Sequence, residues 1–292
     1  MHAEQESIIR LTSFITIFVV MSLLETIFPR RNPTQSRPRR AVRNLTLVAI
    51  NTFVLRLLPF LSAVAVSIWA QSQDIGLLNL IEGPAWLEIL VAVVIFDLLI
   101  FGQHVATHHI PILWMFHRVH HADRDLDATS GLRFHTVEIV FSMIVKCLGV
   151  VLLGPAPEAV ILFEIVLNGT SIFNHSNICL PLWIDNVLRW FIVTPDMHRV
   201  HHSVRIAEAN RNFGFNLPWW DWIFATYLAQ PNDPHQTIAL GLPDSGPTER
   251  PETLVGMLAM PFRPRQRSSR PKGNTSSLSE GASRRAPLPN PP

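Results

Sequence analysis

The pentapeptide HRVHH occurs twice in this chain, at residues 117–121 and again at residues 198–202. At this histidine content an H-x-x-H-H match is expected at roughly one start in 11,000, so chance does not explain two copies. Eleven of the thirteen histidines lie between His104 and His202. Because histidine is the commonest metal ligand, the repetition predicts a fold that brings both copies to one metal site.

Long apolar runs precede and separate these histidines. Charged residues make up 16% of the chain and hydrophobic residues 48%, whereas soluble domains carry roughly 25% charged residues. A run of about 18 apolar residues is long enough to cross the ~30 Å hydrocarbon layer of a bilayer. The sequence predicts membrane helices at residues 11–28, at 45–70 with a break at Arg56 and Pro59, at 86–103, and in a hairpin of 137–154 and 158–174.

An arginine-rich segment sets the expected orientation. Residues 30–43 carry six arginines and no acid, and short loops rich in Lys and Arg stay in the cytoplasm. With the first span ending there, His104, His135 and His175 all emerge at one membrane face, on the cytoplasmic side. We therefore expect a multi-pass integral membrane protein whose histidines gather at that face.

Composition divides the chain into three expected regions. Residues 1–85 hold the N-terminal membrane helices and the arginine-rich loop, residues 86–240 hold the histidines, and residues 241–292 form an extension. From about residue 262 the tail is basic, rich in proline and poor in apolar residues, which predicts disorder. The net charge of +2 gives no reason to expect nucleic acid, and two cysteines are too few for an iron–sulfur cluster.

The spacing of the histidines places them on common helix faces. His104 and His108 are four residues apart, and within each pentapeptide the first histidine precedes the other two by three and four residues. Side chains at such spacings are neighbours on a helix surface. Two further histidines flank the predicted hairpin. The candidate metal ligands are His104, His108, His117, His120, His121, His135, His175, His198, His201 and His202.

Ten imidazoles are too many for one metal ion and suit two. Imidazole binds iron, copper, zinc and nickel, and a ligand set without thiolate and with little carboxylate argues against calcium, magnesium or a zinc finger. Four aspartates near the boxes are expected to orient the rings by accepting their second N–H: Asp123, Asp127, Asp196 and Asp221. Asp97 and Asn168 lie in predicted spans and are candidates for lining a substrate path. Packing of Asp97 against Arg56 is an equal alternative.

The order of the boxes resembles a known family. H-x-x-x-H, then two H-x-x-H-H boxes with a hairpin between them, is similar to the fatty acid hydroxylase/sterol desaturase superfamily. The segments LRFH, NHS, TPDMHRVHHS and NFGFNLPWWDWIFATY look especially like its bacterial sterol desaturase-type members. The resemblance covers about residues 86–227. It implies an all-α, polytopic transmembrane bundle with a cytoplasmic histidine-rich cap, in which the ten histidines hold a dinuclear centre of two iron ions.

The activity implied by the resemblance is O2-dependent hydroxylation or desaturation of a lipid, such as a sterol or fatty-acyl substrate, in a bacterial inner membrane. Ether-lipid cleavage belongs to the same group of reactions. No catalytic residue beyond the metal ligands is implied. The chain has no G-x-G-x-x-G or HPGG sequence, so electrons are expected from a separate ferredoxin or cytochrome with an NAD(P)H reductase. The alternative is a non-enzymatic metal-binding or transport protein, which would place its ligands along a pathway near the membrane midplane.

Overall fold

The computed structural model describes residues 3–80, 83–243 and 253–263, which are helical and contain no β-strand. This confirms the predicted all-α class. The long helices are α1 (Ala3–Ile27), α2 (Arg37–Arg56), α3 (Ala63–Ser72), α4 (Ala85–His109), α5 (Pro111–His121), α6 (Thr136–Leu153) and α7 (Pro157–His175). The short ones are α8 (Leu182–Leu188), α9 (Pro195–His201), α10 (Ile206–Ala209), α11 (Trp219–Ile223) and α12 (Leu254–Ala259), with 3-10 turns η1 (Pro59–Leu61), η2 (Leu77–Leu80), η3 (Ser130–Leu132) and η4 (Met260–Phe262). The disorder expected beyond about residue 262 lies, from residue 264 onward, outside the described residues.

Three helices in the described part of the chain are long and apolar enough to cross a membrane. They are Gln5–Ile27 of α1, α4 and α6, and they match the first, third and fourth predicted apolar runs. The second run is not one span. It divides into α2 and α3 around η1, because Pro59 lacks the N–H that a continuous helix requires.

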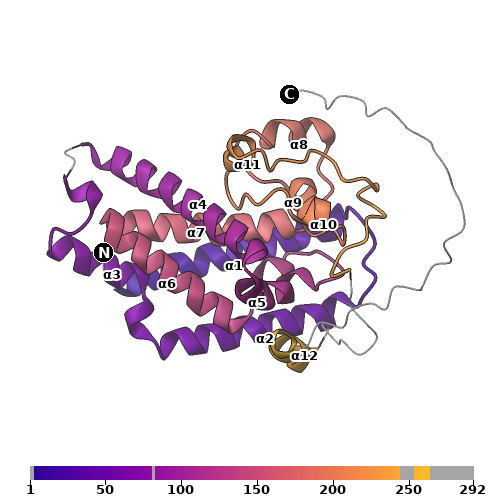
Figure 1. Ribbon diagram of the computed structural model, residues 1–292, viewed down its shortest axis with the longest axis horizontal. Coiled ribbons are helices and arrows are strands. Elements are labelled where there is room, and N and C mark those ends of the chain that lie inside the picture. The colour runs from indigo at the N-terminus through magenta and orange to yellow at the C-terminus, as the bar shows by residue number, and fades with distance from the viewer. Residues whose placement is uncertain (1–2, 81–82, 244–252, 264–292) are drawn as a thin grey trace, which may run out of the picture.

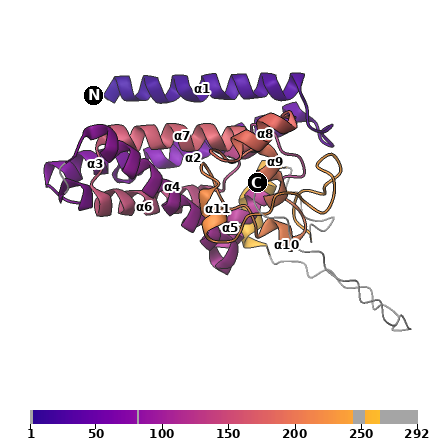
Figure 2. The same cartoon turned by 90° about the horizontal axis from the view of Figure 1, so that it is seen from above.

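The predicted hairpin of α6 and α7 is not a packed pair of helices. The two are joined by a tight turn at Gly154, whose φ of 61° is in the left-handed region that glycine favours. Both pack instead against α3 and α4, which lie between them. Phe96 of α4 stacks on Phe163 of α7 with ring centroids 5.2 Å apart, and α1 forms an outer layer beside α7 (Figure 2).

The short helices α8 to α11 gather with α5 at one end of the bundle (Figure 1). We call this end the cap (residues 111–135 and 176–243). The second HRVHH lies on α9, where the Thr194 side chain accepts a hydrogen bond from the Met197 N–H. Such an N-cap supplies an acceptor for one of the free N–H groups in the first helical turn, so the helix begins where TPDMH predicts.

The arginine-rich segment packs against the cap. The buried Arg40, at the start of α2, donates to Asp123 from Nε at 3.1 Å and from NH2 at 2.7 Å, and to Asp127 at 2.5 Å. Both aspartates lie in the loop that follows the first HRVHH. Burial alone would raise the pKa of Asp123, but the Arg40 and Arg133 guanidiniums lower it below its ordinary value. One cation thus fixes the loop behind the histidines.

The C-terminal segment 253–263 packs against α2 and α5. Met257 joins Leu47 and Val119 in a small buried cluster there. Arg118, inside the first HRVHH, donates to the backbone carbonyls of Met260 and Arg263. The arginine of this pentapeptide therefore anchors α5, while its histidines point elsewhere.

We predict that Arg40→Ala lowers the free energy of unfolding by about 3–5 kcal/mol, because it leaves the buried Asp127 without its cation and Asp123 with only Arg133, 3.8 Å away. The exposed neighbour Arg39 on the same helix provides the control, and Arg39→Ala should change stability by less than about 0.5 kcal/mol. Denaturant unfolding of the detergent-solubilised protein measures both. A loss below 1 kcal/mol in Arg40→Ala would show that the ion pairs do not hold the loop.

Candidate metal centre

Nine of the ten predicted histidines come together in two neighbouring clusters. In each cluster one ring nitrogen of every member lies within 4.8 Å of the others. The five-histidine cluster consists of His104, His108, His117, His121 and His201. The four-histidine cluster consists of His120, His175, His198 and His202. The rings of His121 and His202, one from each cluster, stack with centroids 4.4 Å apart, so the two clusters are in direct contact.

Each HRVHH box contributes histidines to both clusters. On α5, His117 and His121 belong to the five-histidine cluster, while His120 belongs to the four-histidine cluster. The second box reverses this, because His198 and His202 join the four-histidine cluster and His201 joins the other. Residues i and i+4 lie above one another on a helix and residue i+3 is displaced around it. Each box therefore serves two adjacent centres.

The four-histidine cluster has the spacing of ligands around one ion. Nε2 of His175 lies 3.0 Å from Nε2 of His120 and of His198, and 3.2 Å from Nε2 of His202. Ligand nitrogens at ~2.1 Å from a shared metal are themselves about 3.0–3.4 Å apart in octahedral or tetrahedral geometry. His175 Nδ1–H donates to the Ser171 carbonyl at 2.8 Å, which leaves its Nε2 as a lone pair facing the other three rings.

The five-histidine cluster is oriented by acceptors behind the rings. The Nδ1–H groups of His104 and His201 donate to the carbonyls of Phe213 and Arg211 at 2.7 and 2.8 Å. The Nε2 atoms of His104, His117 and His201 are buried without a hydrogen-bond partner among the described residues. Buried nitrogens held in this way as unprotonated acceptors suit a metal ion.

Glu138 of α6 is an acceptor that the sequence reasoning missed. His117 Nδ1–H donates to its Oε1 at 2.5 Å, and both side chains are buried. A carboxylate behind a ligating histidine fixes the tautomer and raises the basicity of the other nitrogen. Asn210 Oδ1, 3.3 Å from His108 Nδ1, has the same place behind that ring. Neither residue lies at a helical spacing from its histidine, so no sequence pattern identifies it.

The four aspartates do not accept from the clustered histidines directly. Asp123 and Asp127 bind Arg40, and Asp196 binds Arg30. Asp221 accepts from the N–H groups of Phe213 and Gly214 at 2.8 and 2.7 Å, and so fixes the loop whose carbonyl orients His104. The expected orienting role belongs to backbone carbonyls, Glu138 and Asn210, because the aspartates lie one layer farther from the rings.

His135 is the one predicted ligand that the structure leaves outside both clusters. It is the N-cap of α6, where Nδ1 accepts from the Val137 N–H at 3.1 Å. Its Nε2–H donates to the Leu258 carbonyl at 3.3 Å. Both nitrogens are therefore engaged by backbone groups, which gives this histidine a structural position at the junction of α6 and the C-terminal segment.

Of the two candidates for lining a substrate path, Asn168 lines the cavity beside the histidines and Asp97 does not. Asp97 accepts from Trp220 Nε1 at 2.8 Å and from the Leu217 N–H at 3.1 Å. It therefore attaches α11 and the loop that precedes it to α4. It does not contact Arg56 and does not line the cavity beside the histidines. Asn168 does line that cavity. The intramembrane acid thus has a structural partner in the indole.

Burial favours the neutral form of five clustered histidines: His120, His121, His198, His201 and His202. For His120, His121, His198 and His202, burial lowers the pKa well below its usual value, and the neighbouring imidazoles lower it further. Burial also lowers the pKa of His201 to about 3, against the opposing effect of the Arg211 carbonyl. Neutral imidazole is the form that binds a metal.

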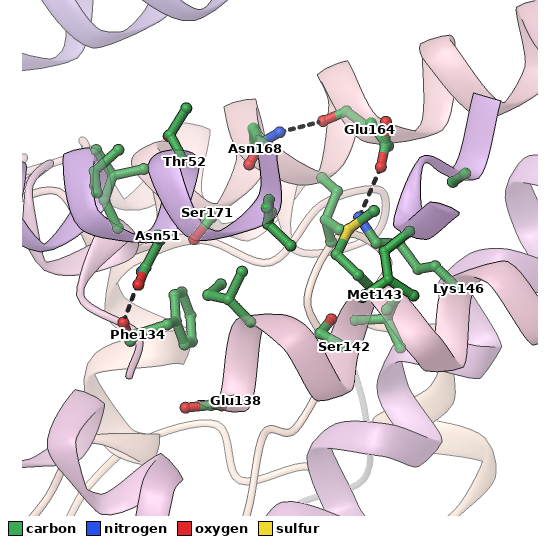
Figure 3. A pocket seen from close by; sticks show the side chains of 18 of the residues that line it. Asn51, Thr52, Phe134, Glu138, Ser142, Met143, Lys146, Glu164, Asn168 and Ser171 are labelled. Carbon is green, nitrogen blue, oxygen red and sulfur yellow. Dashed lines mark hydrogen bonds and ion pairs between the residues drawn. The ribbon is translucent and has the colours of Figure 1, made fainter. Parts of the chain in front are cut away.

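A cavity of about 720 Å³ begins at the five-histidine cluster. His104 and His117 line it at one end, and α6, α7 and α2 form its sides. Figure 3 shows Glu138 at one place along α6, and Lys146 with its partner Glu164 farther along. Most of the lining between these points is apolar, including Ile139 and Met143 of α6 and Leu167 of α7, which suits a hydrocarbon chain.

Comparison with known proteins gives one family. The family model "Fatty acid hydroxylase" matches residues 89–226. An ornithine lipid hydroxylase from Rhizobium tropici is 28% identical over 54% of this chain and 47% of its own length. Human alkylglycerol monooxygenase is 28% identical over 44% of the chain and 27% of its own length. Human cholesterol 25-hydroxylase is 29% identical over 48% and 50%.

The matched regions thus span half the length or less of each of these relatives. No solved structure matches the chain significantly.

Acidification should destabilise the metal-free protein. Histidines in the unfolded chain take up protons below about pH 6.5, whereas the buried rings do not, so the free energy of unfolding falls as the pH drops from about 6.5. For His201 this continues toward pH 3. Thermal unfolding between pH 7.5 and 5.5 measures the slope. His201→Gln should flatten it and the exposed His109→Gln should not; an unfolding temperature that stays constant or rises on acidification contradicts this account.

Removing the carboxylate behind His117 should weaken metal binding. We expect Glu138→Ala to reduce affinity for added zinc by about 10- to 100-fold, the usual cost of losing such a partner. The exposed Glu158 at the start of α7 is the matched control. Competition against a chromophoric chelator measures the affinity, and equal affinities for the two variants would show that Glu138 does not support the site.

Proposed function

Residues 89–226 belong to the fatty acid hydroxylase/sterol desaturase superfamily, and from that premise we propose that this protein is a membrane-bound di-iron oxidoreductase that uses O2 to hydroxylate a lipid. The observation that carries the proposal is the placement of nine histidines in two buried clusters beside an apolar cavity. A lipid chain in that cavity comes close to the metal ligands without leaving an apolar environment.

The two clusters fit two iron ions. Each offers four or five imidazoles and no thiolate, a donor set that suits iron and leaves room for further ligands at a coordination number of up to six. His120, His175, His198 and His202 would hold one ion, and His104, His108, His117, His121 and His201 the other. When bound, such a pair supplies the reducing equivalents and the oxidising power needed to attack an unactivated C–H bond with O2.

The chain itself supplies positioning and a dry environment. Phe134 stacks on the His120 ring with centroids 4.4 Å apart and also lines the cavity. It therefore separates the four-histidine cluster from the substrate space with a rigid apolar surface. Glu138 holds His117 in one tautomer at the cavity wall. These contacts fix where a lipid chain meets the centre and limit access of water.

Hydroxylation is the reaction we favour over desaturation. The relatives in the comparison are named as a hydroxylase of ornithine lipid, a monooxygenase of alkylglycerols and a 25-hydroxylase of cholesterol. Their named substrates are all lipids, which supports a membrane lipid as substrate here. We place the cap on the cytoplasmic side of a bacterial inner membrane, because the arginine-rich segment packs against it. A separate electron-transfer protein would supply the electrons there.

A non-enzymatic metal carrier is the second candidate. It would distribute its ligands along a pathway through the membrane. The helices that carry the two boxes, α5 and α9, instead gather at one end of the bundle (Figure 1), which favours the enzyme.

The proposal predicts that His120→Ala and His201→Ala each abolish lipid oxidation while the protein stays in the membrane. Each substitution removes a ligand from a different cluster. The exposed His109→Ala is the control and should keep activity. The assay is oxygen uptake by the iron-reconstituted protein with an electron donor and a membrane lipid extract, followed by mass spectrometry.

A product heavier by one oxygen atom is the expected result. A product lighter by two hydrogens would replace hydroxylation by desaturation. No change in any lipid, with metal still bound, would favour the carrier.

A further inference from the structure

The cavity has a charged end that the proposed oxidation does not use. Lys146 Nζ lies 2.7 Å from Glu164 Oε1, and Arg10 NH2 lies 2.7 Å from Glu164 Oε2. Lys146 and Glu164 are only 9% and 4% exposed, and all three side chains line the cavity. Charged groups inside a membrane span are costly and mark functional sites by default.

Three cations line the cavity: Arg10, Arg56 and Lys146. Arg56 lies in the last turn of α2, just before η1, which packs against α6, the helix that carries Lys146. Glu164 pairs with two of the three cations, and the other lining carboxylate, Glu138, is bound to His117. Glu6 also pairs with Arg10, at 3.0 Å. Glu164 and Glu6 thus balance Lys146 and Arg10, and the charge of Arg56 is left over among these lining cations. Arg56 has no ion-pair partner among the described residues, and the Lys146 ammonium, with three donors, has one described acceptor.

A purely structural ion pair would not need this surplus. Lys146 alone neutralises Glu164, and α1 already packs along α7 through apolar contacts such as Ile17 against Gly169. A buried cation with spare donors at the end of an apolar cavity suits an anionic oxygen group on a ligand whose chain fills the rest.

We propose that Lys146, Arg10 and Arg56 form a recognition site for the acidic group, a carboxylate or phosphate, of the lipid whose chain reaches the histidines. This rests on the proposed function, because it takes the cavity as the substrate site. Glu164 is a positioning residue that holds the two inner cations side by side, as Figure 3 shows for Lys146.

The site would also set which carbon is oxidised. Glu138, next to the His117 ring, and Lys146 are eight residues apart on α6, a rise of about 12 Å along a helix. A lipid held by its acidic group presents to the histidines the part of its chain that lies this far away. The oxidised position is then counted from the acidic group and does not move with chain length.

Binding of chain-matched probes tests this without turnover. The probes are palmitic acid, 1-palmitoyl lysophosphatidic acid and methyl palmitate, each competing with tritiated palmitic acid on the purified full-length protein. We expect Lys146→Met to weaken the binding of palmitic acid at least tenfold and Arg56→Gln to weaken it about fivefold. The Arg56 side chain is exposed, so its loss does not threaten the fold. Lys146→Arg should retain most of the affinity. Methyl palmitate should bind all variants equally, and Arg39→Gln on the same helix as Arg56 should change nothing.

The two acidic probes distinguish a carboxylate from a phosphate. Whichever of palmitic acid and lysophosphatidic acid binds more tightly identifies the native acidic group, and tight binding of either one supports the site. Wild-type affinity for palmitic acid in both Lys146→Met and Arg56→Gln would overturn the proposal and leave the network as a clamp between α1 and α7. Equal loss of palmitic acid and its methyl ester would overturn it too, because the effect would then lie in the cavity's shape. These outcomes are independent of activity: a protein that binds palmitate through Lys146 yet oxidises no lipid would contradict the proposed function alone.

Discussion

The structure depends on the way one helical turn of HRVHH faces two centres at once. In the first box, His117 and His121 belong to the five-histidine cluster and His120 to the four-histidine cluster. In the second box, His198 and His202 belong to the four-histidine cluster and His201 to the five-histidine cluster. Neither cluster is complete without a residue from each box. This requirement brings the histidine rings of α5 and α9 together at one end of the bundle and explains why the same pentapeptide appears twice.

Bringing nine imidazoles together out of water has a cost that the surrounding scaffold has to offset. Buried polar groups without partners destabilise a fold, and several of these ring nitrogens have no described protein partner. Carbonyls behind the rings, the Arg40 ion pairs behind α5 and the Asp221 contacts behind His104 hold the arrangement in place. Bound metal would satisfy the inward nitrogens, so metal binding would add to the stability of the fold.

The sequence predicted the features that follow from local pattern. Apolar length located α1, α4 and α6, and helical spacing together with family resemblance selected nine histidines that do converge. It failed where the answer depends on tertiary placement. His135 looks like a ligand in sequence, but an N-cap with its side chain turned to Val137 has the same local appearance. The acceptors behind the rings are mostly backbone carbonyls, which no residue type reveals. The separation of α6 from α7 by α3 and α4 could not be read from a short proline turn, and that separation makes the room for the cavity.

The central claim is that two metal ions lie side by side in the histidine clusters. Anomalous diffraction from crystals of the iron-reconstituted protein, collected on both sides of the iron absorption edge, tests it most directly. The account predicts two peaks per chain, one surrounded by His120, His175, His198 and His202 and the other by the remaining five histidines of the centre. A single peak, or peaks away from these rings, would contradict it.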